Sequence, residues 1–136
     1  MKDVLEHLSK LLQQDRLRII EDMGDGDFLA FKPTELTCPA GAHVTLTFHH
    51  AGQRVQQQHD WVLLKPGTAD DFMEAVLRAG EANHWMPPHD SRVIVATPQI
   101  GPGEFVTVEF TAPAPGVYYF RCDAHPDTMR GTLVVR

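Results

Sequence analysis

The spacing of apolar and polar residues changes from a helical period to a strand period near residue 16. Before that point, five aliphatic side chains fall on one face of a helix that would span residues 2–14. These side chains are Val4, Leu5, Leu8, Leu11 and Leu12. We interpret the segment as a short amphipathic helix that packs on its own protein or acts as a linker. Docking on a partner is the alternative.

From residue 16 onward, short apolar runs alternate with turns rich in glycine, proline and aspartate. The clearest run is 43–48, where Val44, Leu46 and Phe48 alternate with threonines, as in a half-buried strand. The other expected strands are 17–20, 28–31, 35–38, 59–64, 92–96, 104–110, 118–122 and a final run that closes the chain. Short strands separated by such turns predict an all-β sandwich or barrel.

One helix interrupts this strand pattern. Residues 69–79 have acids in the first turn and apolar side chains, among them Phe72 and Val76, at helical spacing. Gly80 is the expected stop of this helix. Residues 81–90 contain a tryptophan and two prolines, and they predict an irregular flap beside the strands.

The chain of 136 residues has the size of one domain, which we place at 17–136 after an N-terminal segment 1–16. A formal charge of −6 without any basic run argues against nucleic acid as a partner. No stretch approaches transmembrane length, and charged residues interrupt residues 1–14 where a signal peptide needs an apolar core. We therefore expect that an export signal has been removed or that the domain comes from a longer chain.

Candidate metal ligands gather near the C-terminus, where Cys122, His125 and Met129 lie on a loop between the last two expected strands. Thiolate, imidazole and thioether form a soft donor set, which suits copper better than magnesium or calcium. A trigonal copper site needs a second imidazole. That imidazole must come from another part of the sequence.

His59 is the candidate for this fourth ligand. It precedes a strand rich in bulky apolar residues, with Trp61 and Leu63 on its own face and running into the core. A ligand that precedes such a strand would be held rigidly by the packing of the strand's apolar side chains in the core.

The other histidines in this region are weaker candidates. His49 and His50 are adjacent on a strand and point to opposite faces, so they cannot both reach one metal ion. We interpret them, together with His43, as surface or loop histidines. Cys38 closes an apolar strand end, where a buried inert thiol is expected.

Three alternatives remain open at this point. A structural zinc site would use cysteine and histidine but rarely a thioether. Cys122 could act as a nucleophile with His125, although no orienting carboxylate or oxyanion hole is visible in the sequence. A purely structural sandwich would make the ligand positions accidental.

Five separated segments resemble the azurin and auracyanin branch of the cupredoxins, the blue copper proteins, in the right order and at similar spacing over residues 28–136. They are 59–63, 90–94, 100–104, 118–122 and 129–133. The resemblance implies a Greek-key β-sandwich with a flap helix and one type 1 copper ion that cycles between Cu(I) and Cu(II).

Carried over position by position, the resemblance implies that His59, Cys122 and His125 are the equatorial copper ligands and that Met129 is the weak axial one. It also implies that the backbone carbonyl just before the first histidine approaches the copper. In this chain that residue is Gln58, where azurins have glycine.

Three features depart from the azurin pattern. Only two residues separate Cys122 from His125, as in the shorter loop of amicyanin, where azurins have four. Asp60 replaces the family's asparagine and is expected to face a loop that carries Asp123. Two carboxylates beside the thiolate would favour the oxidised metal and lower the reduction potential. The disulfide common in azurins cannot form.

The function implied is single-electron transfer by a carrier that is not an enzyme. Its expected partners are redox proteins, a cytochrome or an oxidoreductase, which it would meet in short-lived contacts near His125. We expect a periplasmic or otherwise extracytoplasmic location. The alternatives are a copper-carrying or copper-sensing module and an accessory domain of a larger haem or oxidase protein.

Overall fold

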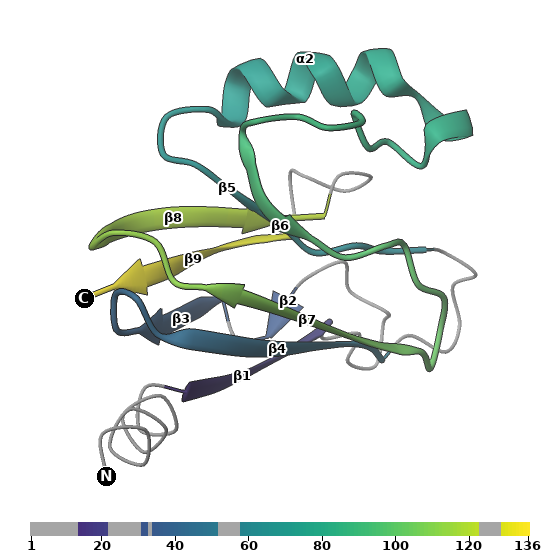
Figure 1. The fold of residues 1–136 in the computed structure, drawn as a ribbon. Helices are drawn as coiled ribbons and strands as arrows, with labels where there is room; N and C mark the ends of the chain where they lie inside the picture. Colours follow the sequence, from purple (N-terminus) through teal and green to yellow (C-terminus); the bar gives the residue numbers. More distant parts are fainter. Residues whose placement is uncertain (1–13, 22–30, 33, 52–57, 123–128) are drawn as a thin grey trace, which may run out of the picture.

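The computed structural model describes residues 14–21, 31–32, 34–51, 58–122 and 129–136, and two β-sheets face each other in it (Figure 1). The first sheet has the strand order β2-β1-β4-β7. Its strands are β1 (Gln14–Glu21), β2 (Phe31–Lys32), β4 (His43–His50) and β7 (Phe105–Thr111). The second sheet has the order β3-β9-β8-β5-β6. Its strands are β3 (Glu35–Cys38), β5 (Val62–Leu64), β6 (Val93–Ala96), β8 (Gly116–Arg121) and β9 (Arg130–Val135).

Strand pairing brings distant parts of the chain together. β1 runs parallel to β4, and β3 runs parallel to β9, whereas the other neighbours in both sheets are antiparallel. The predicted all-β sandwich is confirmed. The predicted N-terminal helix lies outside the described residues except for Gln14, which begins β1, so the division at residue 16 stays a prediction.

The core between the sheets consists of inward-facing side chains, which alternate with outward-facing ones along each strand. In β4, Val44, Leu46 and Phe48 are fully buried, as their alternation predicts. The ring of Phe120 packs edge-on against Phe31 at 5.5 Å between centroids and lies 5.4 Å from Trp61. This aromatic packing fills the core next to Cys122, which belongs to the same cluster.

The predicted flap helix is confirmed with the same boundaries, as α2 (Ala69–Ala79). It ends at Gly80, whose φ of 70° suits glycine. Helix α2 covers the outer face of the second sheet (Figure 1). There Phe72 and Val76 pack on β5 in a second, smaller apolar cluster. A short 3-10 helix, Glu81–Asn83, follows.

Strand β5 is buried on both faces. Trp61 and Leu63 belong to the core between the sheets, whereas Val62 and Leu64 belong to the cluster under α2. This explains why four bulky apolar residues follow one another here with no polar residue between them. The expectation that Trp61 and Leu63 run into the core is confirmed.

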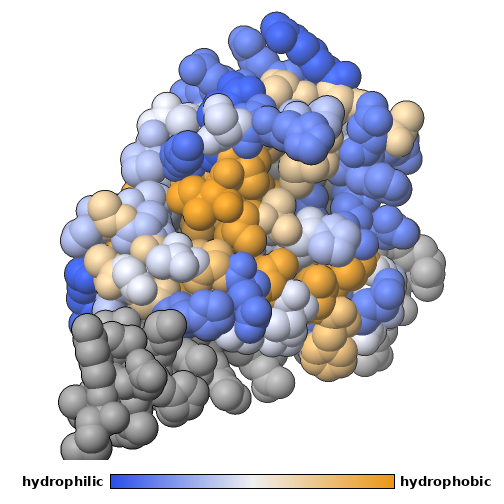
Figure 2. All heavy atoms as spheres, viewed as in Figure 1, coloured by the Kyte–Doolittle hydropathy of each residue, from blue (hydrophilic) through white to orange (hydrophobic). Residues whose placement is uncertain are grey.

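The sandwich has an open edge where β6, the last strand of the second sheet, lies beside β7. Half-buried aliphatic side chains line this edge, and apolar surface is visible in the middle of the face drawn in Figure 2. The side chains are Ile94, Val95, Val106 and Val108. None of the helices in the described residues is long and apolar enough to cross a membrane.

The two cysteines lie at opposite ends of β9. Cys38 pairs with Val135, and the backbone N–H of Cys122 bonds to Met129 just before the strand begins. At a rise of about 3.4 Å per residue, the six steps from Met129 to Val135 separate them by roughly 20 Å. Both are buried, and they cannot form a disulfide with each other.

Candidate metal centre

His59 is held at one end of the sandwich by backbone hydrogen bonds. Its N–H donates to the carbonyl of Ile100 at 3.0 Å, and the N–H of Ile100 donates back to His59 at 2.8 Å. Two residues on, the N–H of Trp61 donates to Oγ1 of the buried Thr97 at 2.9 Å. These bonds lie ahead of β5, so His59 is fixed by a single bridge and not by a continuous strand.

Cys122 and Met129 close the C-terminal loop. The N–H of Cys122 donates to the carbonyl of Met129 at 2.9 Å, immediately beyond the pairing of β8 with β9. Cys122 continues the inward-facing series of Tyr118 and Phe120 on β8. Both loop ends are fully buried. The side chains of Cys122 and Met129 therefore belong to the same core as Trp61 and Ile100, the residues that adjoin His59.

The structure brings His59 and Cys122 into contact, with 3.7 Å between Nδ1 and Sγ. Typical metal bonds of about 2.0 Å to nitrogen and about 2.3 Å to sulfur would hold two such ligands about 3.5–3.7 Å apart at tetrahedral to trigonal angles. The observed separation matches this requirement. The donor set therefore fits a soft metal such as copper.

Burial also sets the protonation state of His59. Removal of its ring from water lowers the pKa of His59 to about 4. The imidazole is therefore neutral at pH 7, as a metal ligand must be.

His125 lies outside the described residues, so its place at the site is untested. In the part of the chain that the structure describes, no group of three histidine, cysteine or acidic side chains is placed to hold a metal ion. His59 and Cys122 supply two such donors, and Met129 is a donor of a different type. The structure thus brings two of the four predicted ligands into contact and buries the third nearby.

The interpretation of His50 as a surface residue is wrong. His50 is fully buried, and its ring lies 4.5 Å from the ring of His59 between centroids, tilted by 42°. Strand β4 extends to this residue, whereas the expected strand ended at residue 48. His50 therefore lies on the same inward face as Phe48. The alternation of inward and outward residues along the strand could have identified His50 as buried. His49, on the opposite face, stacks on Phe105 at 4.1 Å.

Asp60 is also fully buried, although it follows a ligand and carries a carboxylate. It lines a cavity of about 280 Å³ together with Gln58, His84, Met86 and Thr97. Asp123, which was expected on a loop facing Asp60, lies outside the described residues. The expected effect of the two carboxylates on the copper therefore stays a prediction.

The fold and the buried histidine–cysteine pair define a copper protein of the cupredoxin class. The family model of copper-binding proteins of the plastocyanin/azurin type matches residues 18–136, and the chain belongs to this family. Its cofactor is accordingly one type 1 copper ion. The family transfers electrons, and azurins and auracyanins are electron carriers and not enzymes.

Individual relatives agree with this assignment. The chain is 41% identical to auracyanin A of Chloroflexus aurantiacus over 120 residues, which cover 85% of this chain and 73% of the relative. It is 34% identical to azurin iso-2 of Methylomonas sp. strain J, over 79% of this chain and 90% of the relative. The structure of dithionite-reduced auracyanin from Roseiflexus castenholzii superposes with a TM-score of 0.78 at 36% identity, covering 89% of this chain and 96% of that one.

Proposed function

We propose that this protein passes single electrons between redox partner proteins through a copper ion held by His59, Cys122, His125 and Met129. The observation that carries the ligand assignment is the 3.7 Å approach of His59 Nδ1 to Cys122 Sγ, two buried atoms that lie 63 residues apart in sequence. When bound, copper supplies the one-electron redox couple.

The surrounding residues limit movement at the site. The backbone of His59 is fixed to Ile100, and Cys122 is fixed to Met129, so both ligand segments are tied to the sandwich. A rigid ligand set supports fast electron transfer because little rearrangement accompanies the change in oxidation state. Cys122 would bind the copper through its thiolate, and Met129 would contribute its thioether sulfur as a weaker donor.

The burial of the donors favours an electron carrier over a copper-delivery or sensing module. His59, Cys122 and Met129 are all fully buried. A module that hands over its metal needs donors that a partner or chelator can reach. We therefore expect slow loss of copper to a chelator.

His125 would lie nearest to solvent, at the exit from the site, and short-lived contacts with a cytochrome or an oxidoreductase would form around it. A periplasmic or otherwise extracytoplasmic location is part of the same proposal. Its support is the family, because azurins work in that compartment.

The test is titration of the full chain with Cu(II). We expect one copper per chain and an intense visible absorption band from thiolate-to-copper charge transfer. Cys122→Ser should abolish the band. The matched control is Cys38→Ala, which removes the other buried thiol at the far end of β9 and should leave the band in place. Colour that persists in the Cys122 variant, or that vanishes with Cys38, would defeat the ligand assignment.

A further inference from the structure

Strand β7 forms one edge of the first sheet, and it pairs with β4 alone among the strands that the structure describes. The pairing runs without a register shift from Phe105 to Thr111, so β7 is a regular strand of seven residues. Its other side belongs to the open edge of the sandwich, where apolar surface is visible in Figure 2. A regular edge strand of this length offers a template for another strand.

The backbone hydrogen bonds at the two ends of this pairing show which groups of β7 face outward. The N–H of Ala112 donates to the carbonyl of Ala42 at 2.8 Å, and the N–H of His50 donates to that of Glu104 at 3.0 Å. In an antiparallel pair, hydrogen-bonded residues alternate with residues whose backbone groups face away from the partner strand. The even-numbered residues of β7 therefore bond to β4, and the odd-numbered residues turn their N–H and C=O groups to the open edge. These outward residues are Phe105, Thr107, Glu109 and Thr111.

Side-chain contacts agree with this alternation. Opposite residues that do not exchange hydrogen bonds have their side chains closer together than those that do. The hydroxyl oxygens of Thr107 and Thr47 are 3.0 Å apart, and the ring of Phe105 stacks on that of His49 at 4.1 Å. Both pairs join odd-numbered residues of the two strands. Among the described residues, the outward backbone groups of β7 have no hydrogen-bond partner.

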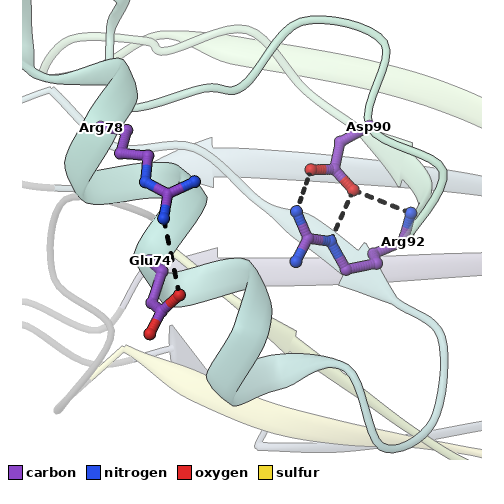
Figure 3. A network of polar contacts seen from close by, with 4 residues as sticks. All are labelled: Glu74, Arg78, Asp90 and Arg92. Atoms are coloured by element: carbon purple, nitrogen blue, oxygen red, sulfur yellow. Dashed lines mark hydrogen bonds and ion pairs between the residues drawn. The ribbon is translucent and has the colours of Figure 1, made fainter.

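The other edge strands of the two sheets are protected against such pairing in ways that β7 is not. β2 has only two residues, and β3 has four. β6 also has four, and its pairing with β5 contains a register shift. A charged pair lies directly ahead of β6, because Arg92 donates to the two carboxylate oxygens of Asp90 at 2.8 and 2.6 Å (Figure 3). β7 contains no proline, lysine or arginine, and Glu109 is its one charged residue.

The sequence of β7 is complementary to itself in one antiparallel register. A twofold axis at Val108 places Glu109 of each copy opposite Thr107 of the other, so each carboxylate faces a hydroxyl group. The same axis places Phe105 opposite Thr111, and all four outward residues are then paired. An axis at Thr107 would instead place Glu109 opposite Phe105, which has no donor for the carboxylate, and would leave Thr111 beyond the paired strand.

We infer that β7 pairs with β7 of a second copy of this chain, in antiparallel direction and about a twofold axis at Val108. The outward residues of the two strands exchange backbone hydrogen bonds, and the first sheets of the two copies join into one continuous sheet. The half-buried side chains of Val106 and Val108 add apolar contact at the joined edges. An edge contact of this kind is small, so the dimer is weak and forms at high protein concentration.

The twofold axis leaves both candidate metal centres outside the contact. β7 begins at the end of the sandwich where β4 reaches His50, whose ring lies 4.5 Å from that of His59. Antiparallel pairing about Val108 places these two ends at opposite ends of the joined strands. The dimer therefore does not depend on the proposed copper ligands.

Sedimentation equilibrium of the full chain, with and without added copper, tests this inference. Between about 10 μM and about 1 mM protein, a range that covers weak association, we expect the average mass to rise reversibly toward twice that of the monomer. A chain that stays monomeric throughout this range would overturn the inference. A mass that rises beyond the dimer would also overturn it, because a twofold contact closes at two copies.

A proline at the centre of the strand tests the backbone contact. Thr107→Pro removes an outward N–H and no hydrogen bond to β4, so the domain should still fold and the chain should stay monomeric over the whole range. Circular dichroism checks the fold. A folded proline variant that still forms the dimer would place the association on another surface and would overturn the inference.

Charge variants test the register and do not depend on the proline. Thr107→Glu places a carboxylate opposite Glu109 of the other copy, twice in the dimer, and should weaken association about threefold or more. Adding Glu109→Lys to this variant should restore association, because opposite charges then face each other. Thr37→Glu makes the same change at an exposed position of the edge strand β3 and should leave the dimer unchanged. Equal losses in the Thr107→Glu and Thr37→Glu variants, or no recovery in the double variant, would refute the pairing.

Discussion

A side chain at Gly131 should disturb both the sheet and the metal centre. This residue pairs with Phe120 across β8 and β9, two positions after Met129. A Cβ built at Gly131 would lie 2.3 Å from Cζ of Phe120 and 2.4 Å from the carbonyl oxygen of Thr34. Neither neighbour can move easily. Phe120 is fully buried, and the Thr34 carbonyl accepts a hydrogen bond from Thr132 at 2.8 Å.

The magnitude follows from these two overlaps. Replacing glycine by alanine within a strand would normally gain about 0.5–1 kcal/mol from the reduced freedom of the unfolded chain. Forcing an extra methyl group into a packed core costs about 1–3 kcal/mol, and here it must displace a ring and a backbone carbonyl together. Two overlaps together place the cost in the upper part of this range, so after subtraction of the gain the net loss for Gly131→Ala should be about 1–2 kcal/mol. For a domain of this size that corresponds to a fall in Tm of about 4–8 °C.

Thermal and urea unfolding of the full chain measure this loss. The control is Gly101→Ala, whose Cβ would meet only Oε1 of Glu104, the end of a flexible side chain, at 2.9 Å. That variant should lose clearly less stability. A Gly131→Ala protein that is as stable as the wild type, or no less stable than the Gly101 variant, would refute the reasoning.

Two further predictions concern His59 and Phe72. The pKa of His59 is lowered by burial to about 4, so between pH 6.5 and 4 the unfolded chain takes up a proton that the folded chain does not. The copper-free protein should therefore lose about 3 kcal/mol as the pH falls through this window, and His59→Gln should lose less; urea unfolding at pH 7 and 4 checks this. Phe72 is fully buried beneath Arg92 and Arg121, and Phe72→Ala should cost about 3–5 kcal/mol by leaving a cavity. Leu77→Ala, an exposed position on the same helix, is its control and should change the free energy of unfolding by less than about 0.5 kcal/mol.

Local elements could be predicted closely from the sequence. β3 and α2 have the predicted boundaries, because the period of apolar positions and the stop at Gly80 are encoded within a few residues. The same local rule would have placed His50 correctly if the alternation in β4 had been continued by one step. The error came from assigning both adjacent histidines to the surface, although they point to opposite faces of the strand and one of these faces is the core.

The sequence by itself determined the class of the fold, the donor types of the candidate centre and the family resemblance, because these depend on local spacing and residue chemistry. Only the tertiary structure decided which distant residues meet. The contact of His59 with Cys122 and the opposition of Arg121 to Arg130 depend on strand register and on the closing of two sheets. Register is set by packing across the whole core, and no short segment of the chain contains that information.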